Sequence, residues 1–267
     1  MPILLLVIIL GIVEGVTEFL PVSSTGHLIL ATELLGFDAA KWALFNIAIQ
    51  PGAILAIVVL YWRTFWNVLV GLFHRSPSAF AFVRNLFIAF VPAVVLGLAL
   101  GDYIETLLGN AWVVAVALIV GGIAILIVEK FARPREQAGG VAGLSLKQSG
   151  LIGLVQCLAM VPGVSRSGAT ILGAMSFGVD RKTAAEFSFF LAVPTLAGAT
   201  ALQLFKHRAE ITSDQLAWIG IGSLVSFVVA VIVVKAFISI ITRFGFAPFA
   251  WYRIAAGAAA LVWLGMR

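Results

Sequence analysis

Four ionisable side chains inside apolar stretches of this 267-residue chain are candidates for chemistry: Glu14, Glu18, His27 and Arg166. A charge inside a hydrophobic membrane segment is costly, so such a residue marks a functional site by default. Glu14 and Glu18 are four residues apart and therefore share one face of a helix. Because two carboxylates repel each other, we expect a positive group between them, either a divalent cation or the guanidinium of Arg166. The alternative is an ion pair with Arg166 that has only a structural role.

Two short segments rich in small polar residues accompany these charges. Residues 21–27 have the sequence PVSSTGH, and residues 162–170 have the sequence PGVSRSGAT. Each predicts a turn that opens a new helix, because Ser and Thr are good N-caps and free backbone amides point out of a helix start. These amides and the helix dipole favour a bound anion. For each Ser or Thr taken alone, capping without a ligand is the alternative.

Two helix starts that meet near one arginine predict a site for two linked phosphates, since the fork of donors on an arginine suits phosphate oxygens. His27 is a candidate general acid or base, or a residue that assists a serine nucleophile, and Glu18 competes for the role of base. A structural histidine is the alternative. Gln50 and Ser188 are polar residues inside predicted spans and further candidates to line the cavity. The residues that we expect to contact phosphate are Ser23, Thr25, Ser165, Arg166, Ser167 and Thr170.

The composition predicts an all-α polytopic membrane protein. Hydrophobic residues make up 62% of the chain and charged residues 11%, whereas a soluble domain has about 25% charged residues. This excludes a soluble globular protein, a disordered chain and a coiled coil. The single cysteine, Cys157, excludes a disulfide framework. The net charge of +5 is typical of basic cytoplasmic loops, so we expect no nucleic-acid partner. Six apolar stretches are long enough, or nearly so, to cross a membrane: residues 42–62, 85–101, 108–128, 186–205, 215–241 and 247–266.

Two further apolar regions, residues 3–35 and 148–179, contain helix breakers near their middle. Proline removes a backbone donor and glycine loosens a helix, so each region should divide into two helical pieces. Broken backbone at membrane depth is tolerated only where it is buried in protein or lines a wet cavity. We therefore predict two re-entrant helical hairpins. A cleaved signal peptide is the alternative for the first region, but residues 1–10 carry no basic segment.

The two broken regions align with each other when the chain is shifted by 142 residues. Ten positions between residues 11 and 45 are then identical to their counterparts, among them Ser23 with Ser165. Each copy consists of one hairpin and three spans, and an odd number of spans makes the second copy enter the membrane from the opposite side. The chain is therefore predicted to be a single membrane domain with an inverted-topology repeat, one copy in residues 1–128 and the other in residues 148–267.

The distribution of Lys and Arg predicts the orientation in the membrane. One set of connections carries eleven of these residues and the opposite side carries four. Because cytoplasmic loops are enriched in Lys and Arg, the first set should be cytoplasmic. Both termini then lie outside, and the first hairpin and the active site face the outer, periplasmic side. The connections of the first set are residues 63–84, 129–147, 180–182 and 235–246.

At the two polar segments the sequence resembles a known family. Residues 14–27, EGVTEFLPVSSTGH, closely resemble the first signature of the bacterial undecaprenyl-diphosphatase family, the bacitracin-resistance type. Residues 162–170 resemble its second signature, and the pattern of spans agrees over nearly the whole chain. The resemblance implies an enzyme of the bacterial inner membrane that removes the terminal phosphate of undecaprenyl diphosphate. Its product would be the monophosphate lipid carrier that is recycled for peptidoglycan and cell-wall synthesis.

The resemblance also implies a metal-assisted reaction, typically with Mg²⁺ or Ca²⁺. We expect Glu14 and Glu18 to hold the metal, and Ser24 to be the nucleophile, with an activated water as second choice. His27 would then shuttle the proton, and Arg166 would stabilise charge on the transferred phosphoryl group. A phosphatidic-acid type of phosphatase is a poor fit, because that class needs a histidine where this chain has Leu172. The family's functional residues map onto Glu14, Glu18, Ser24, His27, Ser165 and Arg166.

A transporter or flippase of a polyprenyl phosphate is the competing hypothesis, because inverted repeats are common in transporters. The two activities do not exclude each other. A receptor or structural membrane protein ranks last, since it leaves four intramembrane ionisable residues unexplained. The expected partners are the membrane and a polyprenyl diphosphate lipid, and the sequence leaves a homodimer open.

Overall fold

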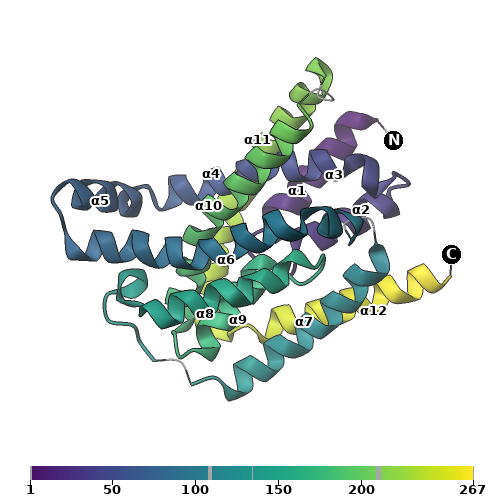
Figure 1. The fold of residues 1–267 in the computed structure, drawn as a ribbon. Helices are drawn as coiled ribbons and strands as arrows, with labels where there is room; N and C mark the ends of the chain where they lie inside the picture. Colours follow the sequence, from purple (N-terminus) through teal and green to yellow (C-terminus); the bar gives the residue numbers. More distant parts are fainter. Residues whose placement is uncertain (1, 108–109, 134, 209–211, 267) are drawn as a thin grey trace.

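The computed structural model describes residues 2–107, 110–133, 135–208 and 212–266. These residues are helical apart from the connections between helices and one isolated β-bridge, which confirms the expected all-α class. Figure 1 shows one bundle that the long helix α11 crosses, with the α5–α6 turn at the opposite end from the two termini. The elements are α1 (Ile3–Thr17), α2 (Ser24–Leu34), α3 (Ala39–Ala48), α4 (Gln50–Leu60), α5 (Trp62–Phe73), α6 (Pro77–Leu107), α7 (Ala111–Phe131), η1 (Gly140–Gly143), α8 (Leu146–Gln156), η2 (Cys157–Met160), α9 (Arg166–Ser176), α10 (Arg181–Lys206), α11 (Ser213–Phe244) and α12 (Ala247–Gly265).

Six segments among the described residues are long and apolar enough to span a membrane, and they correspond one to one to the six predicted spans. The first of them consists of two helices, α3 and α4, which meet at Ile49 just before Pro51. Proline lacks the backbone N–H that would continue the helical bonding, so a change of helix at this point is expected. α6 and α10 each contain an internal proline, Pro92 and Pro194, and continue through it.

Each of the two broken regions forms a pair of helices around a turn. In the first region α1 ends at Thr17, α2 begins at Ser24, and the two helices pack against each other. In the second region α8 ends at Gln156, η2 follows it and ends at Met160, and α9 begins at Arg166. The predicted helix breaks are therefore confirmed, whereas a re-entrant course through the membrane stays a prediction.

One unusual backbone conformation recurs at the 142-residue offset. Ser23 and Ser165 both have a positive φ, 73° and 77°, which is uncommon for a residue other than glycine. Each serine is the N-cap of the following helix, and its hydroxyl accepts a hydrogen bond from the amide of Gly26 or Gly168. The two regions thus share their local structure at the turn, although the inverted orientation of the copies remains a prediction.

Buried aromatic side chains fix the turn after α1 against the neighbouring helices. Phe19 is fully buried, and its ring meets the ring of Phe189 edge-on with centroids 5.4 Å apart. Phe189 in turn contacts Phe237 on α11 with centroids 5.8 Å apart. α1 packs along α11, and α7 packs along α12 (Figure 1). Because Phe19 cannot move without opening this aromatic contact, its neighbour Glu18 is held in one position.

Asp38 and Asp180, which also differ by 142 positions, are the N-caps of α3 and α10. The Asp180 carboxylate accepts hydrogen bonds from the amides of Thr183 at 2.9 Å and Gln137 at 3.3 Å. Burial opposes ionisation of Asp180, but the hydrogen bonds outweigh it and hold the pKa of this carboxyl below its ordinary value. We expect Asp180→Ala to lower the free energy of unfolding at neutral pH by about 1 kcal/mol, and Asp180→Asn to lower it less.

The pH dependence of this cap has a defined sign. Asp180 has a higher pKa in the unfolded chain than in the folded chain, so its stabilising effect is present at neutral pH. The effect is lost as the pH falls through the folded-state pKa. Unfolding titrations of wild type and Asp180→Ala in mixed detergent should therefore converge in acid. If the two proteins still differed in free energy of unfolding at acid pH by as much as at neutral pH, this account would be contradicted.

Candidate active site

Glu18 and Arg166, which are 148 residues apart in the chain, form a buried ion pair. Glu18 follows the last residue of α1, and Arg166 is the first residue of α9. Arg166 Nη2 donates to Glu18 Oε1 at 2.8 Å. The other carboxylate oxygen, Oε2, accepts a short hydrogen bond from the hydroxyl of Ser24, the first residue of α2. Residues from three helices therefore meet at one carboxylate.

The Arg166 guanidinium also contacts α10 and the aromatic core. Its Nη1 donates to the carbonyl of Ser188 at 2.8 Å, and its Cζ lies 5.8 Å from the centre of the Phe19 ring. Thr170, one turn further along α9, donates to the hydroxyl of Ser188 at 2.7 Å. A guanidinium that is held on several sides is already oriented before a ligand arrives, which suits a fixed phosphate donor.

A cavity of about 470 Å³ opens beside this cluster. One end of it is polar, and the remainder is mainly apolar and is formed by α6, α10 and η2. An ionic head and a hydrocarbon chain could both be accommodated in such a space, each against side chains of its own polarity. The polar end is lined by Glu18, Ser23, Ser24, Thr25, Ser165 and Arg166. The apolar part includes Phe90, Val94, Leu98, Met160, Leu196 and Leu202.

Glu14 lies one helical turn before Glu18 and is completely buried. Neither of its carboxylate oxygens has a hydrogen-bond partner among the described residues. The carboxyl group interacts electrostatically with Glu18 and with Arg166, but it does not line the cavity. A buried carboxylate without a donor is costly. A cation beside the Glu14 oxygens would therefore stabilise this carboxylate.

His27 does not line the cavity. Its Nδ1 lies 2.8 Å from the carbonyl oxygen of Ser23, and its Nε2 lies 2.8 Å from the hydroxyl of Tyr252 on α12. The rings of His27 and Tyr252 are stacked with centroids 5.5 Å apart. A carbonyl only accepts, so Nδ1 carries the proton and Nε2 of the neutral ring accepts from Tyr252. Both ring nitrogens are thus engaged by protein groups, and the imidazole supports the turn at Ser23.

The two turns that precede α2 and α9 are joined directly. The Ser167 hydroxyl donates to the carbonyl of Leu20 at 2.7 Å and lies 3.0 Å from the hydroxyl of Ser165. Gly163, in the second turn, has a φ of 92°, and a Cβ at this position would lie 2.7 Å from the carbonyl oxygen of Val114 on α7. Glycine is required here because the turn both adopts a left-handed conformation and touches the α7 backbone.

Arg253 of α12 ties both turns to α7, a role that the sequence analysis did not foresee. The side chain is only 1% exposed and donates five hydrogen bonds, all of them to backbone carbonyls. Three of these carbonyls belong to the turns, at Pro21, Gly163 and Val164. The signal that marks Arg253 is its position as a single charge inside an otherwise uncharged predicted span. The two remaining carbonyls are those of Ala117 and Leu118.

The predicted site residues divide into two groups. Glu18, Ser23, Ser24, Thr25, Ser165 and Arg166 line the cavity, and their side chains are the ones that a ligand would meet. The others contact protein groups or are enclosed behind the first group, and their predicted roles stay predictions. Gln50, a further candidate, lines the cavity, and Ser188 supports Arg166 instead. This second group comprises Glu14, Ser167 and Thr170, which are buried, and His27, which contacts Ser23 and Tyr252.

The fold and the site define a class: a polytopic helical membrane protein with a carboxylate–arginine–serine cluster at the polar end of an apolar cavity. The chain belongs to the family described as bacitracin resistance protein BacA, whose sequence profile matches residues 7–259. This confirms the family that the two signatures indicated.

Curated relatives extend over nearly the whole chain. A protein of Novosphingobium aromaticivorans, named undecaprenyl-diphosphatase, is 60% identical over 264 residues, which cover 97% of both chains. A protein of Sphingopyxis alaskensis with the same name is 56% identical over 261 residues, or 98% of both chains. A third, from Nitrobacter winogradskyi, also carries that name and is 51% identical over 261 residues, 97% of this chain and 96% of the relative.

Proposed function

We propose that this protein is an undecaprenyl-diphosphate phosphatase, which releases the terminal phosphate of undecaprenyl diphosphate and leaves undecaprenyl phosphate. Its family and the names of its relatives support the proposal. The observation that carries it is structural: a carboxylate, a serine hydroxyl and a guanidinium meet at the polar end of an otherwise apolar cavity. The competing hypothesis of a flippase is not favoured, because the relatives are named for hydrolysis.

The cavity separates the two parts of such a substrate by polarity. The diphosphate group belongs at the polar end, where Arg166 and the first amides of α2 and α9 offer donors. The prenyl chain belongs along the apolar walls that α6 and α10 supply. A polyprenyl chain is much longer than this cavity, so its remainder would lie among lipid tails.

Ser24 is positioned as the nucleophile and Glu18 as its base. The Ser24 hydroxyl already donates to Glu18, which takes the proton as the serine oxygen forms a bond to the terminal phosphorus. The phosphoanhydride bond to the same phosphorus breaks, and Glu18 passes the proton to the departing undecaprenyl phosphate. Water then attacks the phosphoserine, gives a proton to Glu18 and forms inorganic phosphate. Glu18 finally returns that proton to the Ser24 oxygen.

Arg166 supplies the electrostatic part of this scheme. Its guanidinium contacts Glu18 and lines the same cavity, so it can hold the diphosphate and stabilise negative charge on the phosphoryl oxygens. His27 holds the Ser23 carbonyl and thereby the turn that presents Ser24. The proton-shuttle role predicted for His27 would require its Nε2 to leave the hydroxyl of Tyr252. Glu18 needs no such movement, and we therefore assign the proton transfers to Glu18.

A divalent cation fits the acidic end of the site. Both Glu14 oxygens are buried without a hydrogen-bond partner among the described residues, and Glu18 lies beside them. Carboxylate oxygens are ligands that Mg²⁺ and Ca²⁺ prefer. The described part of the chain gathers no three His, Cys, Asp or Glu side chains around one point, so the protein would supply two carboxylates and leave the other positions to water and phosphate oxygens. When bound, the cation would neutralise charge on the phosphate oxygens.

The proposed function also includes a membrane and an orientation for the protein. The spans and the family indicate a multi-pass membrane protein. We place it in the bacterial inner membrane with the cavity open to the outer side, because the opposite set of connections carries the excess of Lys and Arg. A lipid diphosphate presented at the outer surface would then reach the site without crossing the membrane.

The proposal is tested by phosphate release from undecaprenyl diphosphate by detergent-solubilised protein, where no second compartment exists. We expect one phosphate per lipid, and we expect Ser24→Ala to lower the rate at least about a hundredfold. Ser239→Ala is the matched control, since this serine is exposed on α11 and should leave the rate unchanged. A phosphoserine trapped at Ser24 by rapid quench would identify the nucleophile.

The possible failures of this experiment are distinguishable. Absence of phosphate release from folded wild-type protein contradicts the hydrolase and returns the flippase to consideration. Full activity of Ser24→Ala contradicts only the role of Ser24 and makes an activated water the nucleophile.

A further inference from the structure

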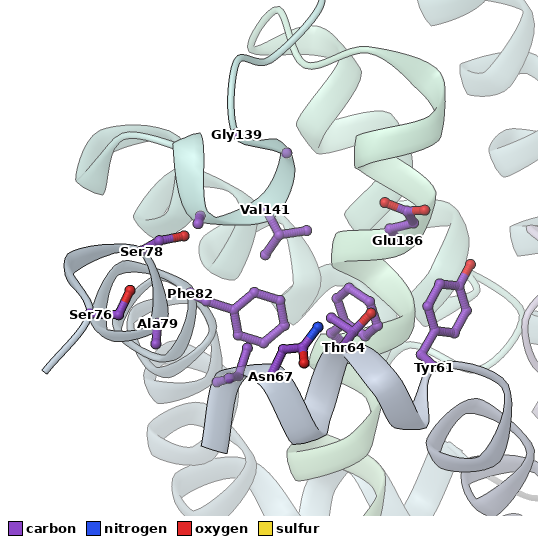
Figure 2. Close-up of a pocket in the computed structure, with 14 residues that line it drawn as sticks. Tyr61, Thr64, Asn67, Ser76, Ser78, Ala79, Phe82, Gly139, Val141 and Glu186 are labelled. Atoms are coloured by element: carbon purple, nitrogen blue, oxygen red, sulfur yellow. The ribbon is translucent and has the colours of Figure 1, made fainter. Parts of the chain in front are cut away.

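A second cavity, of about 400 Å³, lies between α5, the α5–α6 turn, η1 and α10 (Figure 2). It shares no lining residue with the candidate active site. Its wall is unusually polar for a space beside an apolar bundle, since six of the residues that line it have polar side chains. The polar side chains that line it are Tyr61, Thr64, Asn67, Ser76, Ser78 and Glu186.

The polar side chains of this wall have few partners within the protein. No hydrogen bond joins any of these six side chains to another protein group among the described residues. Polar groups inside a protein are nearly always hydrogen-bonded to protein, water or a ligand. Tyr61, Thr64, Ser76 and Glu186 are only partly exposed, so a ligand that enters this open cavity must offer hydrogen bonds in place of water.

The charged residues in the cavity wall indicate which charge a bound ligand should carry. Among the described residues that line it, Glu186 is the one with a charge, and the Tyr61 hydroxyl is close enough to interact with this carboxylate. Lys182 of α10 and Asp180, the N-cap of α10, also act on Glu186, and these two residues carry opposite charges. A carboxylate in the wall favours a cation and repels a lone phosphate. The cavity is thus poorly suited to a polyprenyl phosphate.

The opposite side of the cavity offers donors instead of a charge. Figure 2 shows Ser76 and Ser78 on one side of the space, and Glu186 and Tyr61 on the other. The two serine hydroxyls have no hydrogen-bond partner among the described residues, so they can donate to an anionic oxygen. A ligand with an ammonium at one end and a phosphate at the other would match both sides.

The helix that covers the cavity identifies where such a ligand comes from. Thr64 and Val68 of α5 face the cavity, while Trp62, Trp66 and Phe73 of the same helix are exposed by 56%, 57% and 80%. None of the α5 residues is buried. A helix with a polar side and an exposed face of Trp and Phe is typical of the membrane–water interface. The cavity therefore opens at the level of phospholipid head groups.

We propose that this cavity binds the phosphoethanolamine head group of a membrane phospholipid. The primary ammonium donates to the Glu186 carboxylate and to the Tyr61 oxygen. The phosphate oxygens accept from the hydroxyls of Ser76 and Ser78. A quaternary ammonium has no N–H to donate, so a choline head group of the same charge lacks the first pair of hydrogen bonds.

Native mass spectrometry of the purified full-length protein tests this assignment. Phosphatidylethanolamine and phosphatidylcholine with identical acyl chains are offered in equal amounts, and the bound lipids are counted. We expect wild type to retain the ethanolamine lipid about tenfold better, and Glu186→Gln to lose that preference. Glu136→Gln is the matched control, because Glu136 is exposed and does not line the cavity. An unchanged melting temperature of Glu186→Gln shows that the variant is folded.

Three outcomes overturn the proposal. Equal retention of the two lipids by wild type removes the role of the primary ammonium. An undiminished preference in folded Glu186→Gln removes the role of this carboxylate. Displacement of the lipid by soluble phosphoethanolamine at a similar concentration assigns the cavity to a soluble ligand instead of a membrane lipid.

Discussion

Replacing Arg166 by alanine lowers the rate of phosphate release from undecaprenyl diphosphate by about a hundredfold to a thousandfold, the range expected for loss of one preorganised stabiliser of a transition state. Among the described residues that line the cavity, Arg166 is the one with a positive charge. Arg166→Lys keeps the charge but not the planar fork of donors, so we expect it to recover part of the lost rate. The measurement is kcat/KM of each solubilised variant with the lipid diphosphate.

Stability measurements distinguish a loss of catalysis in the Arg166 variants from a loss of folding. Removal of Arg166 leaves Glu18 in a buried place without its ion-pair partner, which is destabilising. Melting temperature and size-exclusion profile therefore accompany each rate. Arg133→Ala removes an exposed arginine and should retain the wild-type rate. A folded Arg166→Ala protein with more than half of the wild-type rate would contradict the proposed site.

Replacing Arg253 by methionine lowers the free energy of unfolding by at least about 3 kcal/mol. Five carbonyls lose their donor at once, and each buried carbonyl left without a partner is costly. We expect the melting temperature in detergent to fall by about 5–10 °C. Phosphate release should fall as well, because the turns before Ser24 and Arg166 lose a common anchor. Thermal unfolding followed by circular dichroism measures the first effect.

Lys235→Ala is the matched control for Arg253, since it removes a positive charge that is exposed on α11. It should leave the melting temperature nearly unchanged. Gly121 gives an independent variant: a Cβ there would lie 2.0 Å from Arg253 Nη2, so Gly121→Ala should displace the guanidinium and lower the stability too. An Arg253→Met protein that melts at the wild-type temperature would show that the five hydrogen bonds contribute little.

Local chemistry explains why the helix breaks and caps were predictable. Proline and glycine at the turns interrupt helical bonding, and Ser23 and Ser165 follow them at the same offset. The pairing of Arg166 with a glutamate was predictable for a different reason: a buried charge needs a partner, and few partners exist in so apolar a chain. Whether Glu14 or Glu18 meets the guanidinium depends on how α1 ends, and the sequence pattern does not determine that.

The orientation of His27 and the role of Arg253 follow from packing over long distances. His27 meets Tyr252, which is 225 residues away, and this contact exists only because α12 lies beside the first turn. Arg253 binds backbone carbonyls, which every residue has, so no side-chain type marks its partners in advance. Residues that act through carbonyls are for this reason the ones that pattern analysis of a single sequence overlooks.

The five carbonyl bonds of Arg253 restrict how this protein can move. The arginine belongs to the second predicted repeat, and three of its acceptors, at Pro21, Ala117 and Leu118, belong to the first. A rocking motion of one repeat against the other, as in alternating access, would have to break these bonds inside the protein, where water cannot replace them. These bonds therefore hold the two turns and α7 together and oppose such a motion.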